Sequence, residues 1–370
     1  MEEAGTKAIC EALEQNKTLK ELDISGEKFG KSNIGGTAGA KHVAKMVGIN
    51  GGLTSIDLSR NQLCGILRYV DVGQQGSYTS EGITAITNAL RVNGGLTVTN
   101  LLGNQLDAES AKMLAEVAKQ KGISLCGIQR DQTTADFSNQ NLKLPDAIML
   151  ASDLSQAVVT RALTRVDVRQ NNIAGDGPVQ LATAVLGNLK IEMFNEIPIK
   201  EMRANSLTEL DLKGKDVGVE GGMVVAGLIP VMGALTKLSL AWNKLEEEGT
   251  KAICEALEQN KTLKELDISG NRHGNIGGSA GAKHVAKMLG VNGGLTSIDL
   301  SDNQLCGIRT DYRGGQHGAY TAEGITAIAD AMRVNGALIE CDLSNNGMGK
   351  EGKASILSAA QGKAGFNLHL

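Results

Sequence analysis

The sequence predicts an α/β solenoid, a right-handed succession of strands and helices with a parallel sheet on the concave side and helices on the convex side. Two patterns predict this class: a short leucine-rich strand pattern recurs in ten registers along almost the whole chain, and a segment with helical spacing follows it. Composition agrees, because glycine supplies 47 of 370 residues and proline only 4, without the Gly-X-Y period of collagen. This composition is typical of a repetitive chain in which glycine-containing turns recur at regular intervals.

The strand pattern is Leu-x-x-Leu-x-Leu, usually extended by x-x-Asn-x-Leu. Alternate residues of a strand point to opposite faces, so the last two apolar residues are expected inside and the residue between them outside. A helical segment such as Gly5 to Asn16 carries Ile9 and Leu13 on one apolar stripe. Strand, helix and next strand form a right-handed crossover, and stacked repeats bury the apolar faces that one repeat cannot bury alone. The registers span residues 19–24, 53–63, 96–106, 135–142, 163–173, 207–217, 235–245, 263–271, 295–305 and 338–348.

These patterns closely resemble the ribonuclease-inhibitor-like class of leucine-rich repeat proteins, and the resemblance covers residues 5 to 370. It implies a horseshoe-shaped solenoid. Asparagines recur after the strand pattern, where their side chains are expected to satisfy backbone groups of the turn. The members of this column are Asn61, Asn104, Asn171, Asn243, Asn271, Asn303 and Asn346.

A long internal duplication lies on top of the short repeat. Residues Gly5 to Gly26 recur unchanged at Gly249 to Gly270, and the superrepeat copies span about 5–106 and 249–348. Residues 174–206 are irregular and are expected to form a bend or short repeat, whereas 366–370 alternate like a closing strand. The chain starts in the middle of a repeat, as if cut from a longer array or deprived of its cap. We predict one continuous repeat domain over residues 1–370.

Charge, cysteines and motifs exclude several function classes. A net charge of −4 without a basic stripe argues against nucleic-acid binding, and no apolar run of membrane-spanning length occurs. The six cysteines lack a CxxC pair, which favours free, partly buried thiols in a reducing, cytoplasmic compartment. The GxSxG, HExxH and phosphate-loop motifs are absent. We therefore predict a protein that is not an enzyme, with no cofactor and no dedicated metal site.

The outward strand position is the first candidate binding surface, because it is acidic in eight of ten registers. Aligned strands would form columns of like charge that attract a basic protein. Alternatively, the aspartates belong to the repeat consensus and are partly neutralised by Lys20, Arg165, Lys213, Lys237 and Lys264. Both interpretations stay open. The acidic positions are Asp23, Asp57, Asp136, Asp167, Asp211, Asp267, Asp299 and Asp342.

The aromatic residues give a second candidate surface. All four tyrosines, Tyr69, Tyr78, Tyr312 and Tyr320, fall in two equivalent insertions between strand and helix. Loops on a rim often carry function, and tyrosine and tryptophan are enriched at binding hot spots. The tyrosines either contact a partner or pack the insertions onto the solenoid, and the single tryptophan, Trp242, is likewise either an exposed anchor or packed over the next turn.

Together these features predict a noncatalytic scaffold that binds a protein partner, either a basic protein or a larger assembly. The first alternative is a GTPase-activating protein of the leucine-rich repeat type, although no arginine or asparagine here matches the functional loop of that family and a long acidic tail is missing. A second is the sensor repeat region of a larger innate receptor. A third is a purely structural subunit of an assembly.

Overall fold

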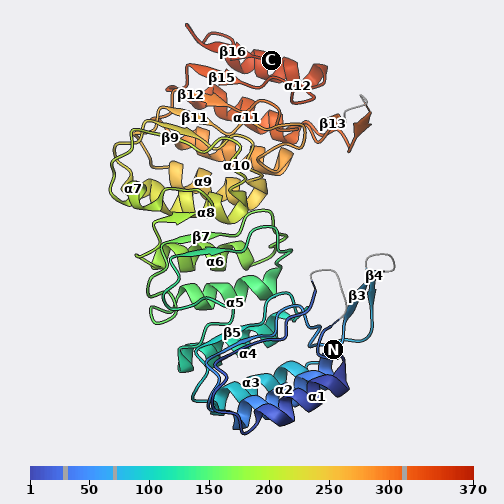
Figure 1. Cartoon of the computed structure of the whole chain (residues 1–370). Coiled ribbons are helices and arrows are strands. Elements are labelled where there is room, and N and C mark those ends of the chain that lie inside the picture. The colour runs from blue at the N-terminus through green and yellow to red at the C-terminus, as the bar shows by residue number, and fades with distance from the viewer. Residues whose placement is uncertain (28–31, 70–72, 311–314) are drawn as a thin grey trace. The chain divides into compact units, whose positions relative to one another are not determined.

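A computed structural model describes residues 1–27, 32–69, 73–310 and 315–370, with only the backbone described at strand residues 67–69, 73–75, 309, 310 and 316. Helices and strands alternate along the chain (Figure 1). The chain divides into two compact units, Met1–Lys190 and Ile191–Leu370. Each unit is a stack of strand–helix repeats with its own buried core. The predicted α/β solenoid class is confirmed, while the single continuous domain stays a prediction.

The first unit contains six long helices and the strands that precede or follow them. Strands β1, β2 and β5 form one parallel sheet, and β6 pairs in parallel with β7. The insertion after β2 is an antiparallel hairpin of β3 and β4. The elements are α1 (Glu3–Leu13), β1 (Glu21–Asp23), α2 (Gly36–Ile49), β2 (Ser55–Asp57), β3 (Leu67–Tyr69), β4 (Gly73–Gln75), α3 (Glu81–Val92), β5 (Val98–Asn100), α4 (Ala108–Lys121), β6 (Thr134–Asp136), α5 (Leu144–Leu154), β7 (Arg165–Asp167) and α6 (Gly177–Gly187).

The second unit is more regular. Its parallel sheet has the order β16-β15-β12-β11-β10-β9, and β13 and β14 repeat the hairpin insertion. Residues 366–370, expected to form a strand, contain β16, which pairs with β15. The elements are β8 (Met193–Phe194), α7 (Ile199–Arg203), β9 (Glu209–Asp211), α8 (Gly218–Leu228), the 3-10 turn η1 (Ile229–Val231), β10 (Lys237–Ser239), α9 (Glu246–Leu257), β11 (Glu265–Asp267), α10 (Gly278–Val291), β12 (Ser297–Asp299), β13 (Arg309–Thr310), β14 (Gln316–His317), α11 (Glu323–Val334), β15 (Glu340–Asp342), α12 (Lys350–Ala360) and β16 (Asn367–His369).

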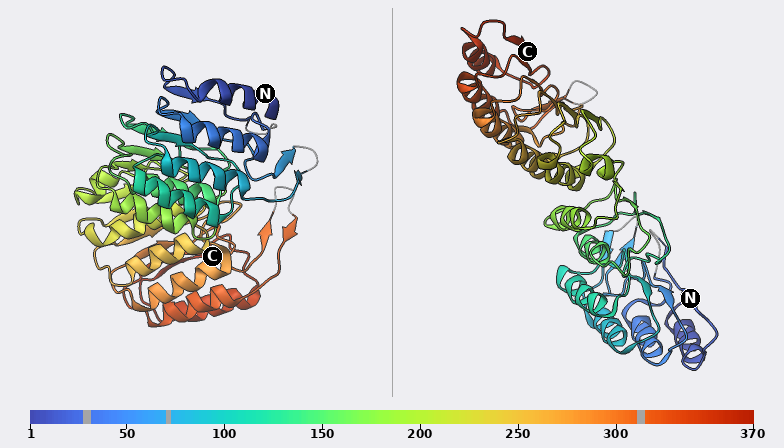
Figure 2. Two further views of the ribbon diagram at one scale, coloured as in Figure 1. Left: turned by 90° about the horizontal axis from the view of Figure 1, so that it is seen from below. Right: turned by 90° about the vertical axis from the view of Figure 1, so that its left-hand side faces the viewer.

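In each unit the helices form one layer and the strands another (Figure 2). The core lies between the layers, where the central strand residues Leu238, Leu266 and Ile298 are buried. Close packing explains one glycine of the pattern. Gly281 lies in the first turn of α10, where a Cβ would collide with the carbonyl oxygen of Ile276, so only glycine fits at this position. Burial of such apolar side chains is the main stabilising contribution.

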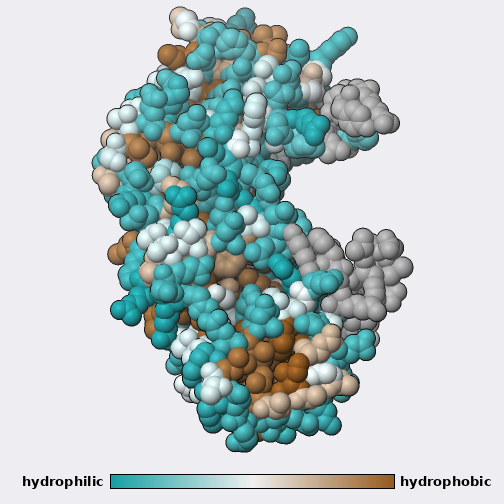
Figure 3. Space-filling model, in the orientation of Figure 1, coloured by the Kyte–Doolittle hydropathy of each residue, from teal (hydrophilic) through white to brown (hydrophobic). Residues whose placement is uncertain are grey.

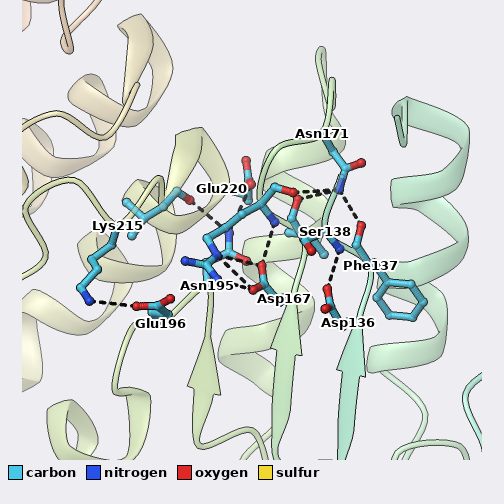
Figure 4. Close-up of polar contacts among 12 residues, drawn as sticks. Asp136, Phe137, Ser138, Asp167, Asn171, Asn195, Glu196, Lys215 and Glu220 are labelled. Carbon is cyan, nitrogen blue, oxygen red and sulfur yellow. Dashed lines mark hydrogen bonds and ion pairs between the residues drawn. The ribbon is translucent and has the colours of Figure 1, made fainter. Parts of the chain in front are cut away.

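Buried asparagines connect successive repeats at the strand ends. The Asn303 side chain accepts hydrogen bonds from the backbone N–H of Asn275 and donates to the carbonyls of Ile268 and Leu300. Asn171 donates in the same way to Phe137 and Val168 (Figure 4). These hydrogen bonds confirm the predicted role of the asparagines, which is to satisfy backbone groups of the turn after each strand.

One member of the predicted asparagine column is wrong. Asn271 lies in the turn, where its side chain accepts from the N–H of His273, whereas Asn275 occupies the buried position. The Asn275 side chain donates to the carbonyls of Leu240 and Ile268. The shift has a simple cause: four extra residues between the strand and the buried asparagine displace it from the regular spacing.

A second asparagine ladder, which the sequence analysis missed, lies at the other edge of the repeats, where helices return to strands. Asn292 donates to the carbonyls of Leu257 and Asn260, at 2.6 and 2.9 Å, and accepts from the N–H groups of Gly294 and Leu295. Equivalent bonds are made by Asn50, Asn93 and Asn335. The signal was available in the sequence as an Asn directly after each of the helical segments 36–49, 81–92, 278–291 and 323–334.

Two stretches depart from the repeat. Residues 122–133 contain no helix, and a buried carboxylate, Asp153, binds this turn by accepting from the Ser124 hydroxyl and the N–H groups of Leu125 and Cys126. Burial raises the pKa of Asp153 to about 6. The sequence analysis missed this irregularity, because residues 122–133 follow a regular helix, α4, and no register was assigned between residues 106 and 135.

The stretch 174–206, expected to be irregular, begins with a regular helix and continues with much shorter elements. Helix α6 is regular, whereas β8 has two residues and α7 five, which makes the shortened repeat that was expected. Here the buried Asn195 side chain donates to the carbonyl of Val217 and to the carboxylate of Glu220 (Figure 4). Burial raises the pKa of Glu220 to about 7. The boundary between the two compact units also falls in this stretch.

Candidate protein-binding face

The outward strand residues of the second unit lie in one register. Asp211 is paired with Ser239, Ser239 with Asp267, Asp267 with Asp299, and Asp299 with Asp342. Neighbouring strands are about 4.8 Å apart, so these side chains form one continuous column. In the first unit the equivalent columns are shorter, Asp23–Asp57–Asn100 and Asp136–Asp167.

Each column aspartate also has a structural role. In Asp267 and Asp342 the Oδ1 oxygen accepts the backbone N–H two residues further on, at 3.0 and 2.8 Å, which fixes the turn after the strand. The same bond joins Asp136 to Ser138 at 2.8 Å (Figure 4). Hydrogen bonding from the Ser138 side chain, followed by this backbone bond, lowers the pKa of Asp136. This geometry supports the consensus interpretation, because the repeat itself requires an acceptor at this position. It leaves the second carboxylate oxygen for other contacts.

The long column places Asp299 between two other carboxylates, Asp267 and Asp342. Burial, followed by the neighbouring charges of Asp267 and Asp342, raises the pKa of Asp299, although hydrogen bonds from Ser301 act in the opposite direction. Ser239, the neutral member, donates its hydroxyl to Asp267 at 3.0 Å. A cationic group placed over Asp299 would relieve this repulsion.

In the first-unit columns, one aspartate forms an ion pair and another accepts from a neutral amide. Arg169 binds both carboxylate oxygens of Asp167, with its Nη2 atom 2.6 Å from Oδ2. The Asn100 side chain donates to Asp57 at 2.9 Å. Because Arg169 is positively charged, its ion pair makes Asp167 a weaker attractor of a cation. The neutral Asn100 amide leaves the charge of Asp57 in place, as the Ser239 hydroxyl does for Asp267.

The lysines expected to neutralise the columns are engaged elsewhere. Lys264 donates to the carbonyls of Lys261 and Gly294, and Lys20 makes the equivalent bond to Gly52. Lys237 forms an ion pair with Glu265 at 2.9 Å on the adjacent outward column. Lys20 and Lys264 therefore reach loop carbonyls, whereas the charge of Asp211 still acts on Lys237. Both interpretations of the acidic columns remain predictions.

A further outward column accompanies the aspartates and was missed by the sequence analysis. It precedes the aspartate column by two residues on every strand, so its carboxylates lie on the same face. Ser297 donates to Glu340 at 3.0 Å, and Asn367 donates to the same carboxylate. The members in the second unit are Glu209, Lys237, Glu265, Ser297, Glu340 and Asn367.

Trp242 lies in the turn that follows β10. Its backbone has φ +61, a left-handed conformation that several residues at this repeat position share. The side chain is 48% exposed, and the ammonium of Lys213 lies 4.5 Å from the ring centroid. The tryptophan is therefore both partly packed and accessible, next to the acidic column, as a cation–π pair.

Of the four candidate tyrosines, the two at the ends of the hairpin insertions have described side chains. The Tyr78 hydroxyl is 2.9 Å from the Ser110 hydroxyl and also accepts from the N–H of Asp107. Burial raises the pKa of Tyr78 to about 12. Tyr320 contacts the start of α12 in the equivalent way, beside Gly349 and Gly352. These contacts favour a packing role.

The remaining two tyrosines cannot be assigned in the same way. The side chain of Tyr69 and the whole of Tyr312 lie outside the described residues.

All six cysteines are buried and free, as expected. Burial raises the pKa of each thiol, for example that of Cys341 to about 12. Within the described residues, no group of three or more His, Cys, Asp or Glu side chains is arranged to hold a metal ion. No helix in the described part of the chain is long and apolar enough to cross a membrane.

Comparison with known proteins gives matches along the chain. A family model described as "Leucine Rich repeat" matches residues 235–254 and 259–280. A ribonuclease inhibitor of Sus scrofa is 25% identical and is aligned over 97% of this chain and 84% of its own length. Protein CARMIL of Dictyostelium discoideum is 22% identical over 95% of this chain, which spans 34% of that protein. Among solved structures, the leucine-rich repeat-containing protein LegL7 of Legionella pneumophila is 16% identical, with 92% of this chain and 87% of that chain covered and a TM-score of 0.29.

Proposed function

Because the chain is a leucine-rich repeat protein, we propose that it is a noncatalytic binding module that captures a basic protein on the outward face of β9 to β15. The observation that carries the proposal is the continuous register of Asp211, Ser239, Asp267, Asp299 and Asp342. A row of carboxylates on rigid strands concentrates negative potential on one face. Because no loop has to become ordered when a partner binds, little conformational entropy is lost.

Two further observations support this face. Trp242 and Lys213 border the column and provide an accessible aromatic surface of the kind that forms hot spots. One relative, ribonuclease inhibitor, acts by its name on a ribonuclease, which is a protein. The partner of the present chain is proposed only as a basic protein.

The test is differential capture with crosslink mapping from the native source. The Asp267→Lys/Asp299→Lys variant reverses two charges on the proposed face, and Glu255→Lys/Glu351→Lys makes the same net change on exposed helix residues. We expect a partner that crosslinks to the strand face of the wild type, is retained by the helix variant and is lost by the strand variant. Equal retention by both variants, or crosslinks confined to the helices, contradicts the proposed face.

Trp242→Ala provides a second, independent variant. The side chain is half-exposed, so its removal leaves the core intact. Removing a hot-spot aromatic is expected to weaken the captured complex at least tenfold. If the Trp242→Ala variant bound the partner with unchanged affinity, Trp242 would not belong to the binding site, which would then consist of the acidic column alone.

A further inference from the structure

A groove lies in the helix layer of the first unit, with α5 as its floor and α4 and α6 as its walls. Its volume is about 410 Å³, and a second cavity of about 450 Å³ continues it at the carboxyl ends of α5 and α6. Both cavities are bordered by Ser155, Thr183 and Ala184. The floor is a single stripe of α5 and the residue after it, made by Ile148, Ala151, Ser152 and Ser155. We call this surface the α5 groove.

Two buried carboxylates hold α5 close to the strand layer. Near the start of the helix, Asp146 accepts the backbone N–H of Gly103, and near its end Asp153 accepts those of Leu125 and Cys126. Every residue of α5 from Asp146 to the helix end is buried, whereas α4 and α6 keep exposed residues where they form the walls. Helix α5 is therefore recessed between its two neighbours, and this recess is the groove.

The groove offers mainly apolar surface. The Ser155 hydroxyl donates to the carbonyl of Ala151 at 2.6 Å, and the Thr183 hydroxyl donates to that of Val179 at 2.7 Å, so both donors are satisfied within their own repeat. Val179 on the α6 wall is 51% exposed. Hydrophobic residues also gather in separate patches on the face of the molecule drawn in Figure 3. The charged residues of the walls distinguish the groove from a plain apolar patch.

Ion pairs bridge neighbouring helices in other parts of the helix layer. In the first unit Lys41 of α2 pairs with Glu81 of α3 at 2.6 Å, and in the second unit Lys283 of α10 pairs with Glu323 of α11 at the same distance. Further bridges of this kind join Lys45 to Glu14 and Lys287 to Glu258. Facing helices in these repeats therefore neutralise each other.

Helices α4, α5 and α6 have no such arrangement. The α4 wall carries Lys112, Glu116 and Lys119, all exposed. The only charged residues of α5 are Asp146 and Asp153, which are buried, and α6 has no charged residue at all. The charged side chains of α4 therefore have no ionic partner across the groove.

Lysines outnumber carboxylates along the groove. Glu116 lies between Lys112 and Lys119 and offsets one of their charges, while Lys190 adds a third ammonium at the far end. The Lys190 ammonium donates to the carbonyl of Arg161, a neutral group that leaves its charge in place. Three lysines and one glutamate give the lining a net charge of +2, in a chain whose net charge is −4. Carboxylates are the groups that complement such a surface.

We propose that the α5 groove binds an amphipathic helix of another protein, one that carries an apolar stripe flanked by Asp or Glu. The apolar stripe lies on the α5 floor, and the acidic residues lie beside Lys112 and Lys119. Recognition of this kind uses anchors spaced by three and four residues, the spacing that the α5 floor itself has. The 11 residues of α5 make a floor about 16 Å long, enough for three helical turns. The groove lies in the helix layer, so this site goes beyond the one proposed on the strand face.

The test selects peptides on the full chain and compares matched variants. A phage-displayed library of helical peptides of about four turns is selected on the wild type and depleted on Thr183→Trp, which fills the groove. Ser155→Trp fills it from the other side, and Thr326→Trp makes the same change on α11; all three positions are exposed. Lys112→Glu/Lys119→Glu reverses the charge of the α4 wall, and Lys251→Glu/Lys353→Glu does so at exposed helix lysines elsewhere. Thermal melting checks that each variant is folded.

Fluorescence anisotropy then gives the affinity of each selected peptide. We expect an apolar stripe with enriched Asp and Glu beside it. Each groove-filling variant is expected to weaken binding at least about tenfold, as is Lys112→Glu/Lys119→Glu, whereas the two control variants change it less than about twofold.

Three results would overturn the proposal: no peptide that the groove-filling variants exclude, groove-dependent peptides without acidic enrichment, or wild-type affinity in Lys112→Glu/Lys119→Glu. Self-association of the wild type that Thr183→Trp abolishes would assign the groove to a second copy of the chain and would equally contradict it.

Discussion

The identical segments Gly5–Gly26 and Gly249–Gly270 permit a stability measurement with an internal control. Ile253→Ala and Ile9→Ala make the same change in the same local sequence, so the helix propensity gained by alanine cancels in the comparison. At Ile253, which is 1% exposed, the change removes apolar contacts on all sides and is expected to lower the free energy of unfolding by about 3 kcal/mol. At Ile9, which is 39% exposed, solvent fills the space and the loss should be about 1 kcal/mol.

Urea unfolding provides the assay. Trp242 is the only tryptophan, so its fluorescence reports the second unit, and far-UV circular dichroism reports both units. The experiment is done at low protein concentration, where self-association is negligible. The predicted difference between the variants is about 2 kcal/mol. Losses that agree within about 0.5 kcal/mol would refute the reasoning, because identical segments would then be equally covered.

Three further predictions follow from the buried polar groups. Asn303→Ala leaves several backbone groups of the ladder without partners and should cost about 2–4 kcal/mol by thermal melting, whereas Asn172→Ala, on the surface, should cost less than about 1 kcal/mol. The raised pKa values of Asp153 and Glu220, about 6 and about 7, mean that the folded chain binds protons more tightly than the unfolded chain, so stability should fall as pH rises from about 4.5 to 7; a melting temperature that rises over this window contradicts it. Thiols such as Cys341 are buried with raised pKa values, so iodoacetamide should modify them at neutral pH only after urea is added, and rapid labelling of the folded protein would be the contrary result.

The fold was predictable because the leucine positions of the repeat indicate directly which strand residues are buried. Leucine spacing identified the strands β9, β10, β11, β12 and β15, and the alternating end of the chain identified β16. The same logic failed where spacing changes: Asn275 replaced Asn271 in the ladder, and the turn held by Asp153 contains no repeat pattern to read. Hydrogen bonds between residues of different repeats determine both features, and one repeat read alone does not contain them.

The candidate site was predictable in composition but not in electrostatics. The acidic positions followed from the register, yet their neutralisation depends on where long side chains reach. Arg169 folds back onto Asp167, whereas Lys264 reaches the carbonyl of Gly294 and leaves the column acidic. Side-chain rotamers of lysine and arginine have many alternatives of similar energy, so sequence spacing does not select among them.

The central claim, that the acidic strand face of the second unit binds a basic protein, is tested most directly by calorimetric titration of the captured partner into matched variants. The account predicts that Asp267→Lys/Asp299→Lys weakens the affinity at least about 100-fold, because two attractive contacts become repulsive, while Glu255→Lys/Glu351→Lys changes it less than about threefold. Equal effects of the two variants, or wild-type affinity in the strand variant, would contradict the claim.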